Sequence, residues 1–156
     1  MEDISPVDRD YELCILLGQT RDAICKARKR ELEQYSVLPE QALVLFIIQA
    51  IGNEATPAEI SRWLFREPHS VSGILERMKK DGLVRKAKDI HRKNLIRVML
   101  TEKGQQAYNQ SLKRKSIHQI MSSLSEEERQ QLRSYLERLR SEALKHLVSR
   151  RKILFP

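Results

Sequence analysis

Residues 56–101, TPAEISRWLFREPHSVSGILERMKKDGLVRKAKDIHRKNLIRVMLT, contain the pattern that decides the fold. The stretch opens with Thr56-Pro57-Ala58-Glu59, a capping box with proline at the first helical position, which predicts a short helix over residues 56–65. A second helix is expected from Pro68 to Lys80, because proline suits the first turn and Asp81-Gly82 suits a stop. Its inner face carries Val71, Ile74, Leu75 and Met78, at helical spacing.

The second half of this stretch predicts a basic β-hairpin. Strand-like runs at 83–86 and 95–100 flank a charged tip at 87–94. Residues 77–97 hold nine Lys or Arg and two Asp, a local net charge of +7, while the whole chain of 156 residues carries +8. Apolar residues keep their spacing through this stretch, as they would not in a disordered basic tail. Such a concentrated basic surface favours a polyanionic partner, double-stranded DNA above all.

Outward from this stretch, the N-terminal part predicts two helices. From residue 7 to 35 the chain has no proline and only one glycine, which indicates one long helix. Its front half, LCILLG (13–18), is apolar nearly all round and must be covered on several sides, as when subunits intertwine. A second, buried helix is expected from Pro39 to Ile51, ahead of Gly52.

The C-terminal part predicts two more helices. Thr101 caps a helix that we expect to run to about Ser122, and Ser125-Glu126-Glu127-Glu128 is a capping box that opens the next one. That last helix carries an apolar stripe, formed by Leu132, Tyr135, Leu136, Leu139, Ala143 and Leu147. The apolar faces exceed what one compact unit needs, so we expect a homodimer.

The pattern as a whole predicts a mainly α protein of the α+β type, a winged helix-turn-helix with dimerisation helices at both ends. The expected units are an N-terminal dimerisation helix (1–38), a DNA-binding domain (39–104) and C-terminal dimerisation helices (105–156). A helix fits the major groove, which is ~12 Å wide, and a hairpin reaches the flanking minor groove or its phosphates. The residues expected to contact DNA are His69, Ser70, Ser72, Gly73, Arg77, Lys80, Lys88, His91, Arg92 and Lys93.

The chain resembles the MarR-type transcriptional regulators. The resemblance covers essentially the whole chain and is carried by PEQALVLFII (39–48), SVSGILERMKKDGLV (70–84) and LTEKG (100–104). It implies an obligate homodimer that binds a pseudo-palindromic operator and is released by a small ligand or by oxidation. The family's wing usually reads Asp-x-Arg about nine residues before Leu-Thr, whereas Arg92-Lys93-Asn94 stands there, with Asp89 three residues earlier. We expect Arg92 to make the tip contact, with Lys93 as the alternative.

The resemblance also implies a ligand-responsive repressor. The family's effector pocket lies between the dimerisation helices and the winged domain, and the candidate lining residues are Leu13, Leu17, Val44, Ile47 and Trp63. The first two helices are similar to a subgroup found beside reductive-dehalogenase operons in organohalide-respiring bacteria. We therefore expect a small aromatic or otherwise lipophilic effector, halogenated if the chain belongs with this subgroup.

Two other function classes stay open at this point. Cys14 stands at a position similar to the sensing cysteine of the family's organic-hydroperoxide branch, so the chain could be a thiol-based oxidant sensor, or Cys14 could be a buried packing residue. The basic face could also serve an architectural module that binds nucleic acid without a regulatory ligand. A ratio of specific to nonspecific affinity of ~10³ or more would favour the regulator.

Several classes are not expected. The four histidines are scattered without a metal-ligand spacing, and no nucleophile motif is present, so we expect no metal site, no cofactor and no enzyme activity. The longest apolar run, ALVLFII (42–48), is far shorter than the ~20 residues of a membrane span. The acidic N-terminus lacks the apolar region of a signal peptide, so we expect a cytoplasmic protein with no membrane partner.

Overall fold

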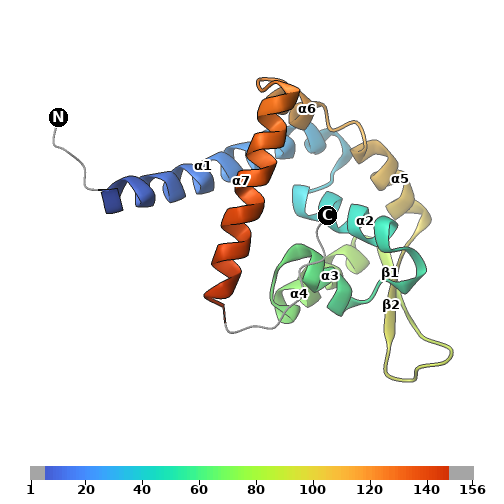
Figure 1. Cartoon of the computed structure of the whole chain (residues 1–156). Coiled ribbons are helices and arrows are strands. Elements are labelled where there is room, and N and C mark those ends of the chain that lie inside the picture. The colour runs from blue at the N-terminus through green and yellow to red at the C-terminus, as the bar shows by residue number, and fades with distance from the viewer. Residues whose placement is uncertain (1–5, 148–156) are drawn as a thin grey trace.

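The computed structural model describes residues 6–147 and is mainly helical, with one small sheet (Figure 1). The elements are α1 (Pro6–Leu32), η1 (Glu33–Tyr35), α2 (Pro39–Ile51), η2 (Gly52–Glu54), α3 (Pro57–Leu64), α4 (Pro68–Lys80), β1 (Val84–Lys88), β2 (Ile96–Leu100), α5 (Glu102–Ser111), α6 (Lys115–Met121) and α7 (Glu126–Lys145). The winged helix-turn-helix expected from the sequence is confirmed, and α2 and α4 have the predicted bounds.

The start of α3 corrects one detail of the sequence interpretation. The hydroxyl of Thr56 accepts a hydrogen bond from the Glu59 amide at 3.2 Å, as a capping box requires. The Glu59 carboxylate instead pairs with Arg62 one turn later. Only the Thr56 half of the predicted box is therefore seen, because a charged partner is available to Glu59.

The predicted helix from Thr101 to Ser122 was wrong in its length. It is two helices, α5 and α6, separated by Arg114 in the left-handed conformation with φ of 43°. At the break, the Ser111 carbonyl accepts a hydrogen bond from the Arg28 guanidinium of α1 at 2.6 Å. Glu31 of α1 binds the Ser116 amide and hydroxyl at 3.3 and 2.6 Å. Contacts from a distant helix thus replace local helical bonds, and nothing in residues 101–122 themselves signals them.

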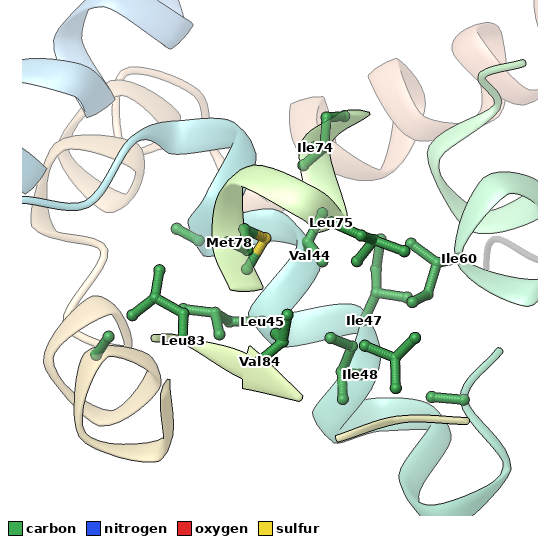
Figure 2. Close-up of a cluster of buried hydrophobic side chains, with 14 of the residues drawn as sticks. Val44, Leu45, Ile47, Ile48, Ile60, Ile74, Leu75, Met78, Leu83 and Val84 are labelled. Atoms are coloured by element: carbon green, nitrogen blue, oxygen red, sulfur yellow. The ribbon is translucent and has the colours of Figure 1, made fainter. Parts of the chain in front are cut away.

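The core lies inside the winged unit, around α2. Val44, Leu45 and Ile47 of α2 are fully buried, and Figure 2 shows them packed among side chains of α3, α4 and β1. The inner face of α4 takes part as predicted, with Val71, Ile74, Leu75 and Met78 all buried. Leu32, Val37 and Ala107 belong to the same cluster, so the core continues across the boundaries expected at 38/39 and 104/105.

The sheet is a two-stranded antiparallel hairpin whose register pairs Val84 with Leu100 and Lys88 with Ile96. Its inner edge is tied to the helices, because the Val98 amide donates to the Ala55 carbonyl at 2.9 Å, just before α3. The far end of the hairpin extends away from the helical body (Figure 1). The wing is therefore anchored at its base and free at its tip.

Two helices lie largely outside this core. α1 runs away from the winged unit and packs against α6 near its own C-terminal end (Figure 1). α7 begins with the complete predicted capping box, since Ser125 and Glu128 bind each other's backbone amides at 3.1 and 2.7 Å. None of its residues is buried. Both helices thus leave apolar side chains uncovered.

Within residues 6–147, no single helix is long and apolar enough to cross a membrane. The segments 8–35 and 39–54 reach that length and composition only together, as a pair bent by 82°.

Candidate DNA-binding surface

The turn between α3 and α4 is held by side-chain and backbone contacts that fix the angle of the two helices. The Ser61 hydroxyl donates to the Arg66 carbonyl at 2.6 Å, and the Arg66 amide returns a bond to the Ser61 carbonyl at 3.2 Å. Phe65 ends α3 in the left-handed conformation, with φ of 52°. Arg66 also pairs with Glu40 on α2. The second helix of the motif is therefore set rigidly against the core.

The outer face of α4 is free to meet another surface. The predicted contact residues on it are all exposed: His69, Ser70, Ser72, Gly73, Arg77 and Lys80. A Cβ added at Gly73 would meet nothing within 4 Å, so the backbone itself is accessible there. Small polar groups near the N-terminal end and cations near the C-terminal end suit a helix that enters a major groove.

The C-terminal end of α4 is fixed by a buried glutamine. Gln41, on α2, donates to the Asp81 carboxylate at 3.0 Å and accepts from the Leu38 amide at 3.1 Å. The Lys103 ammonium reaches the Asp81 carbonyl at 2.7 Å. Gly82, with φ of 76°, then turns the chain into β1. These bonds couple the start of α2 to the end of the candidate recognition helix.

The wing tip is organised by Asp89 and Arg97. The side chain of Asp89 is 4% exposed and accepts bonds from the His91 and Arg92 amides, at 2.7 and 3.2 Å. Arg97 pairs with it at 2.6 Å and also reaches Glu54 at 3.2 Å and the Asn53 carbonyl at 2.5 Å. The hydrogen bond from the His91 amide, followed by that from Arg97, lowers the pKa of Asp89 to about 2. The same carboxylate raises the pKa of Arg97.

This arrangement decides which wing cations remain available. Lys88, His91, Arg92 and Lys93 are exposed, as the sequence predicts for a contact surface. Arg97 is engaged between Asp89 and η2 and serves the wing itself. Lys86 pairs with Glu76 of α4, whose pKa it lowers, so this lysine holds the hairpin to the helix.

The expected effector residues lie in different environments within the single chain. Val44 and Ile47 are fully buried in the core of the winged unit, while Leu13 and Leu17 are exposed on the outer half of α1 and Trp63 is half-buried on α3. A cavity of about 330 Å³ lies between α1, α2 and the α5–α6 junction. Its lining residues are Arg28, Pro39, Ala42, Leu43, Phe46, Ser111, Arg114 and Ile117.

Sequence reasoning missed the charged groups around this cavity. Arg28 is buried, binds Glu31 at 2.7 Å and spans to the Ser111 carbonyl, while the Arg114 guanidinium sits 5.1 Å from the centre of the Phe46 ring. Burial raises the pKa of Glu31, but hydrogen bonds from Ser116 and Arg28 outweigh it and lower that pKa to about 2. The helical spacing of residues in α1 did not predict these contacts. The partners of Arg28 and Glu31 are Ser111 and Ser116, which lie 83 and 85 residues away in the chain.

Cys14 and Cys25 are free thiols, both exposed on α1 of the protomer. In the described part of the chain, no group of three or more His, Cys, Asp or Glu side chains is placed to hold a metal ion.

Comparison with known proteins finds similarity to transcriptional regulators. A family model described as MarR family matches residues 35–93. The homoprotocatechuate degradative operon repressor of Escherichia coli is 39% identical over 127 residues, which cover 80% of this chain and 85% of that protein.

Among solved structures, the organohalide-sensing RdhR transcriptional regulator, in its form bound to 2,4-dichlorophenol, is 31% identical with a TM-score of 0.86. That match covers 100% of this chain and 95% of the other. A mutant MarR of E. coli in complex with operator DNA has a TM-score of 0.79 at 18% identity, over 87% and 99% of the two chains, and so shares the fold. The chain belongs to the MarR family, because the family model matches residues 35–93 and the E. coli repressor is 39% identical over 80% of the chain.

Proposed function

We propose that this protein is a homodimeric, sequence-specific DNA-binding repressor that a small aromatic effector releases from its operator. The observation that carries the proposal is the exposed face of α4 beside a wing whose tip presents Arg92 and Lys93. Both elements are fixed to one core, so a helix in the major groove and a hairpin at the flanking groove are presented as one rigid surface.

The homodimer is supported by the uncovered apolar faces of α1 and α7. Tyr11 on α1 is 69% exposed and Tyr135 on α7 is 55% exposed, and each belongs to a row of exposed apolar residues. The row on α1 contains Tyr11, Leu13, Ile15, Leu16 and Leu17, and the row on α7 contains Leu132, Tyr135, Leu136 and Leu139. Large contiguous apolar patches mark interaction surfaces. A second copy presents the same patches and so suits a two-fold interface.

The cavity between α1, α2 and the α5–α6 junction supports an effector that combines one aromatic ring with an anionic group. Its volume of about 330 Å³ lies near the lower end of ligand pockets, which suits a single ring. Leu43, Phe46 and Ile117 offer apolar walls, and Arg114 offers a cation for a phenolate or a carboxylate, while Arg28 beside it is already paired with Glu31. The relative bound to 2,4-dichlorophenol and the repressor of the homoprotocatechuate operon support this class.

The experiment for DNA binding selects duplexes from a random-sequence library with the full-length protein. We expect enrichment of a pseudo-palindrome. Arg77→Ala should then cost ~1–3 kcal/mol of binding and relax the preference at particular bases, because a bidentate contact to guanine is lost. Lys113→Ala, which removes a cation outside this surface, is the control and should leave the binding unchanged. Equal weakening on all sequences would make Arg77 a phosphate contact.

The experiment for the effector measures calorimetric binding of 2,4-dichlorophenol and of homoprotocatechuate. Arg114→Gly removes the cation but keeps the left-handed conformation that φ of 43° requires. It should weaken binding about tenfold, which is ~1.4 kcal/mol, while the neighbouring variant Lys113→Ala should not. If neither probe binds, or if Arg114→Gly binds equally well, the cavity is not the effector site for this chemical class.

A further inference from the structure

We propose that Ile90, at the tip of the wing, packs its apolar side chain into the minor groove of DNA and so contributes affinity that does not depend on salt. The proposal rests on the proposed DNA binding and adds a contact of a different chemical kind. Ile90 is 92% exposed, the highest value among the exposed large apolar side chains of the described residues. Nothing in the protomer's own core accounts for an isoleucine there.

The conformation around Ile90 is fixed from both sides. Asp89, which precedes it, binds the amides of His91 and Arg92 through one carboxylate oxygen and Arg97 through the other. The Asp89 amide donates to the Leu95 carbonyl at 2.9 Å, which closes the loop at its base. The Leu95 amide in turn donates to the Arg92 carbonyl at 2.9 Å. A side chain held on such a turn loses less conformational entropy on binding than one on a loose loop.

The residues beside Ile90 indicate its partner. His91, Arg92 and Lys93 are exposed polar groups on the same tip, and such a cluster attracts phosphates. The tip lies far from the helical body (Figure 1), so it reaches past the groove that α4 would occupy. The minor groove is ~6 Å wide, and proteins that enter it use Ile, Leu, Phe, Met or Pro as apolar wedges flanked by cations. An exposed isoleucine on a tip that also carries the exposed cations Arg92 and Lys93 matches that chemistry better than it matches a protein partner with an apolar face.

The test compares two matched variants of the full-length dimer, Ile90→Ala and Lys93→Ala, on the duplex that the wild-type protein enriches from a random library. Affinity is measured by fluorescence anisotropy over a series of salt concentrations. Ile90→Ala should weaken binding about tenfold at every salt concentration, with an unchanged slope of log K against log salt. Lys93→Ala should lower the slope by ~1 per bound wing, because it removes a phosphate-neutralising charge.

A second measurement places the contact in the minor groove. G·C pairs under the wing add the guanine amino group to the groove floor, whereas inosine·cytosine pairs do not, although both present a similar major groove. Relative to a duplex with A·T pairs under the wing, the wild-type protein should bind the G·C duplex more weakly and the inosine·cytosine duplex equally well. Ile90→Ala should show a smaller difference in affinity between the G·C and inosine·cytosine duplexes.

The outcomes separate this inference from the proposed function. If the wild-type protein enriches no duplex, the DNA-binding proposal itself fails. If the wild-type protein binds tightly and Ile90→Ala binds equally well, only the Ile90 contact is overturned. A changed salt slope for Ile90→Ala would also overturn it, because the residue would then act through the placement of its charged neighbours. Equal thermal melting of the two variants is expected, since both substitutions are at exposed positions.

Discussion

Gly104 shows how one residue joins the wing to α5. A Cβ at this position would lie 1.9 Å from the Leu83 carbonyl oxygen and 3.0 Å from its carbon, both backbone atoms, which move aside less easily than the end of a flexible side chain. The nearby Thr101 hydroxyl accepts a hydrogen bond from the Gly104 amide at 3.0 Å, and the Thr101 amide donates one to the same Leu83 carbonyl at 3.1 Å. The segment LTEKG therefore fastens the end of β2 and the start of α5 to the loop before β1.

Gly104→Ala should accordingly lower the free energy of unfolding by ~1–3 kcal/mol, the usual cost of overpacking a closely packed site. Chemical denaturation followed by circular dichroism measures this loss. Gly73→Ala is the control, because a Cβ there meets nothing within 4 Å and alanine favours the helix by ~1 kcal/mol. A Gly104→Ala protein as stable as wild type would show that the Leu83 carbonyl can move.

Glu31 provides a second residue-level prediction, on acid stability. Its pKa falls from 4.5 to about 2 on folding, so the ionised carboxylate stabilises the folded state above pH 4.5 and loses that contribution as pH falls toward 2. Glu31→Gln should cost ~1.5–3 kcal/mol near neutral pH, because it weakens charged hydrogen bonds to Arg28 and Ser116. The difference in unfolding free energy between the two proteins should shrink between pH 4.5 and 2. A difference that stays constant over this range would contradict the assigned role of the carboxylate.

At the scale of the element, the wing is a hairpin whose base and tip have separate tasks. In the strands, Arg97 pairs with Glu54 of η2 and Lys86 pairs with Glu76 of α4, while Asp89 pairs with Arg97 at the start of the tip loop. The tip cations Arg92 and Lys93 are left exposed. Because the base is paired internally, the electrostatic contribution of the wing to DNA binding depends on few side chains.

Replacing Arg92 and Lys93 together by alanine should therefore lower the slope of log K against log salt by ~1–2 per bound wing, while base preference in the major groove survives. Salt titrations of binding to the selected duplex measure this. Stability should change by less than ~0.5 kcal/mol, as is usual for exposed positions. An unchanged slope would mean that the tip does not touch DNA and that Lys79, Lys80 and Arg85 carry the interaction.

At the scale of the whole molecule, the chain leaves two helices with apolar faces that it does not itself cover. The winged unit has its own core, but α7 has no buried residue and the front half of α1 is exposed. A 20-residue helix without burial gains little from its capping box alone, because most helical stability in proteins comes from packing. The proposed homodimer would bury both helices against a second copy of the chain.

Introducing charge into this face should disrupt the dimer and with it the binding of a two-half-site operator. Leu136→Glu combined with Leu139→Glu places carboxylates in the stripe of α7, and sedimentation should then show a monomer or an unfolded chain. Ser134→Glu adds a charge on the opposite side of the same helix and should leave the dimer intact. A stable, folded dimer of the double variant would exclude α7 from the interface.

The sequence by itself determined most of the elements and their order, except for the break between α5 and α6, because these depend on local signals. Pro39 and Pro68 at first helical turns, the Ser125 capping box and the strand-like runs on either side of the charged tip at 87–94 are each readable within a few neighbours. The outward face of α4 also followed, since the buried positions 71, 74, 75 and 78 fix the opposite side of the helix.

The tertiary structure alone decided the details that depend on partners far along the chain. The helix break at Arg114 depends on hydrogen bonds of Arg28 and Glu31 of α1 with residues on either side of it. Arg97 is held within the wing because it contacts the Asn53 carbonyl and the Glu54 carboxylate. The cavity is lined by Pro39, Ala42, Leu43 and Phe46 of α2, whereas Val44 and Ile47, which the apolar pattern named, lie in the core of the winged unit. Local periodicity tells which side chains are buried, whereas the neighbours of a buried or charged group depend on how distant segments pack.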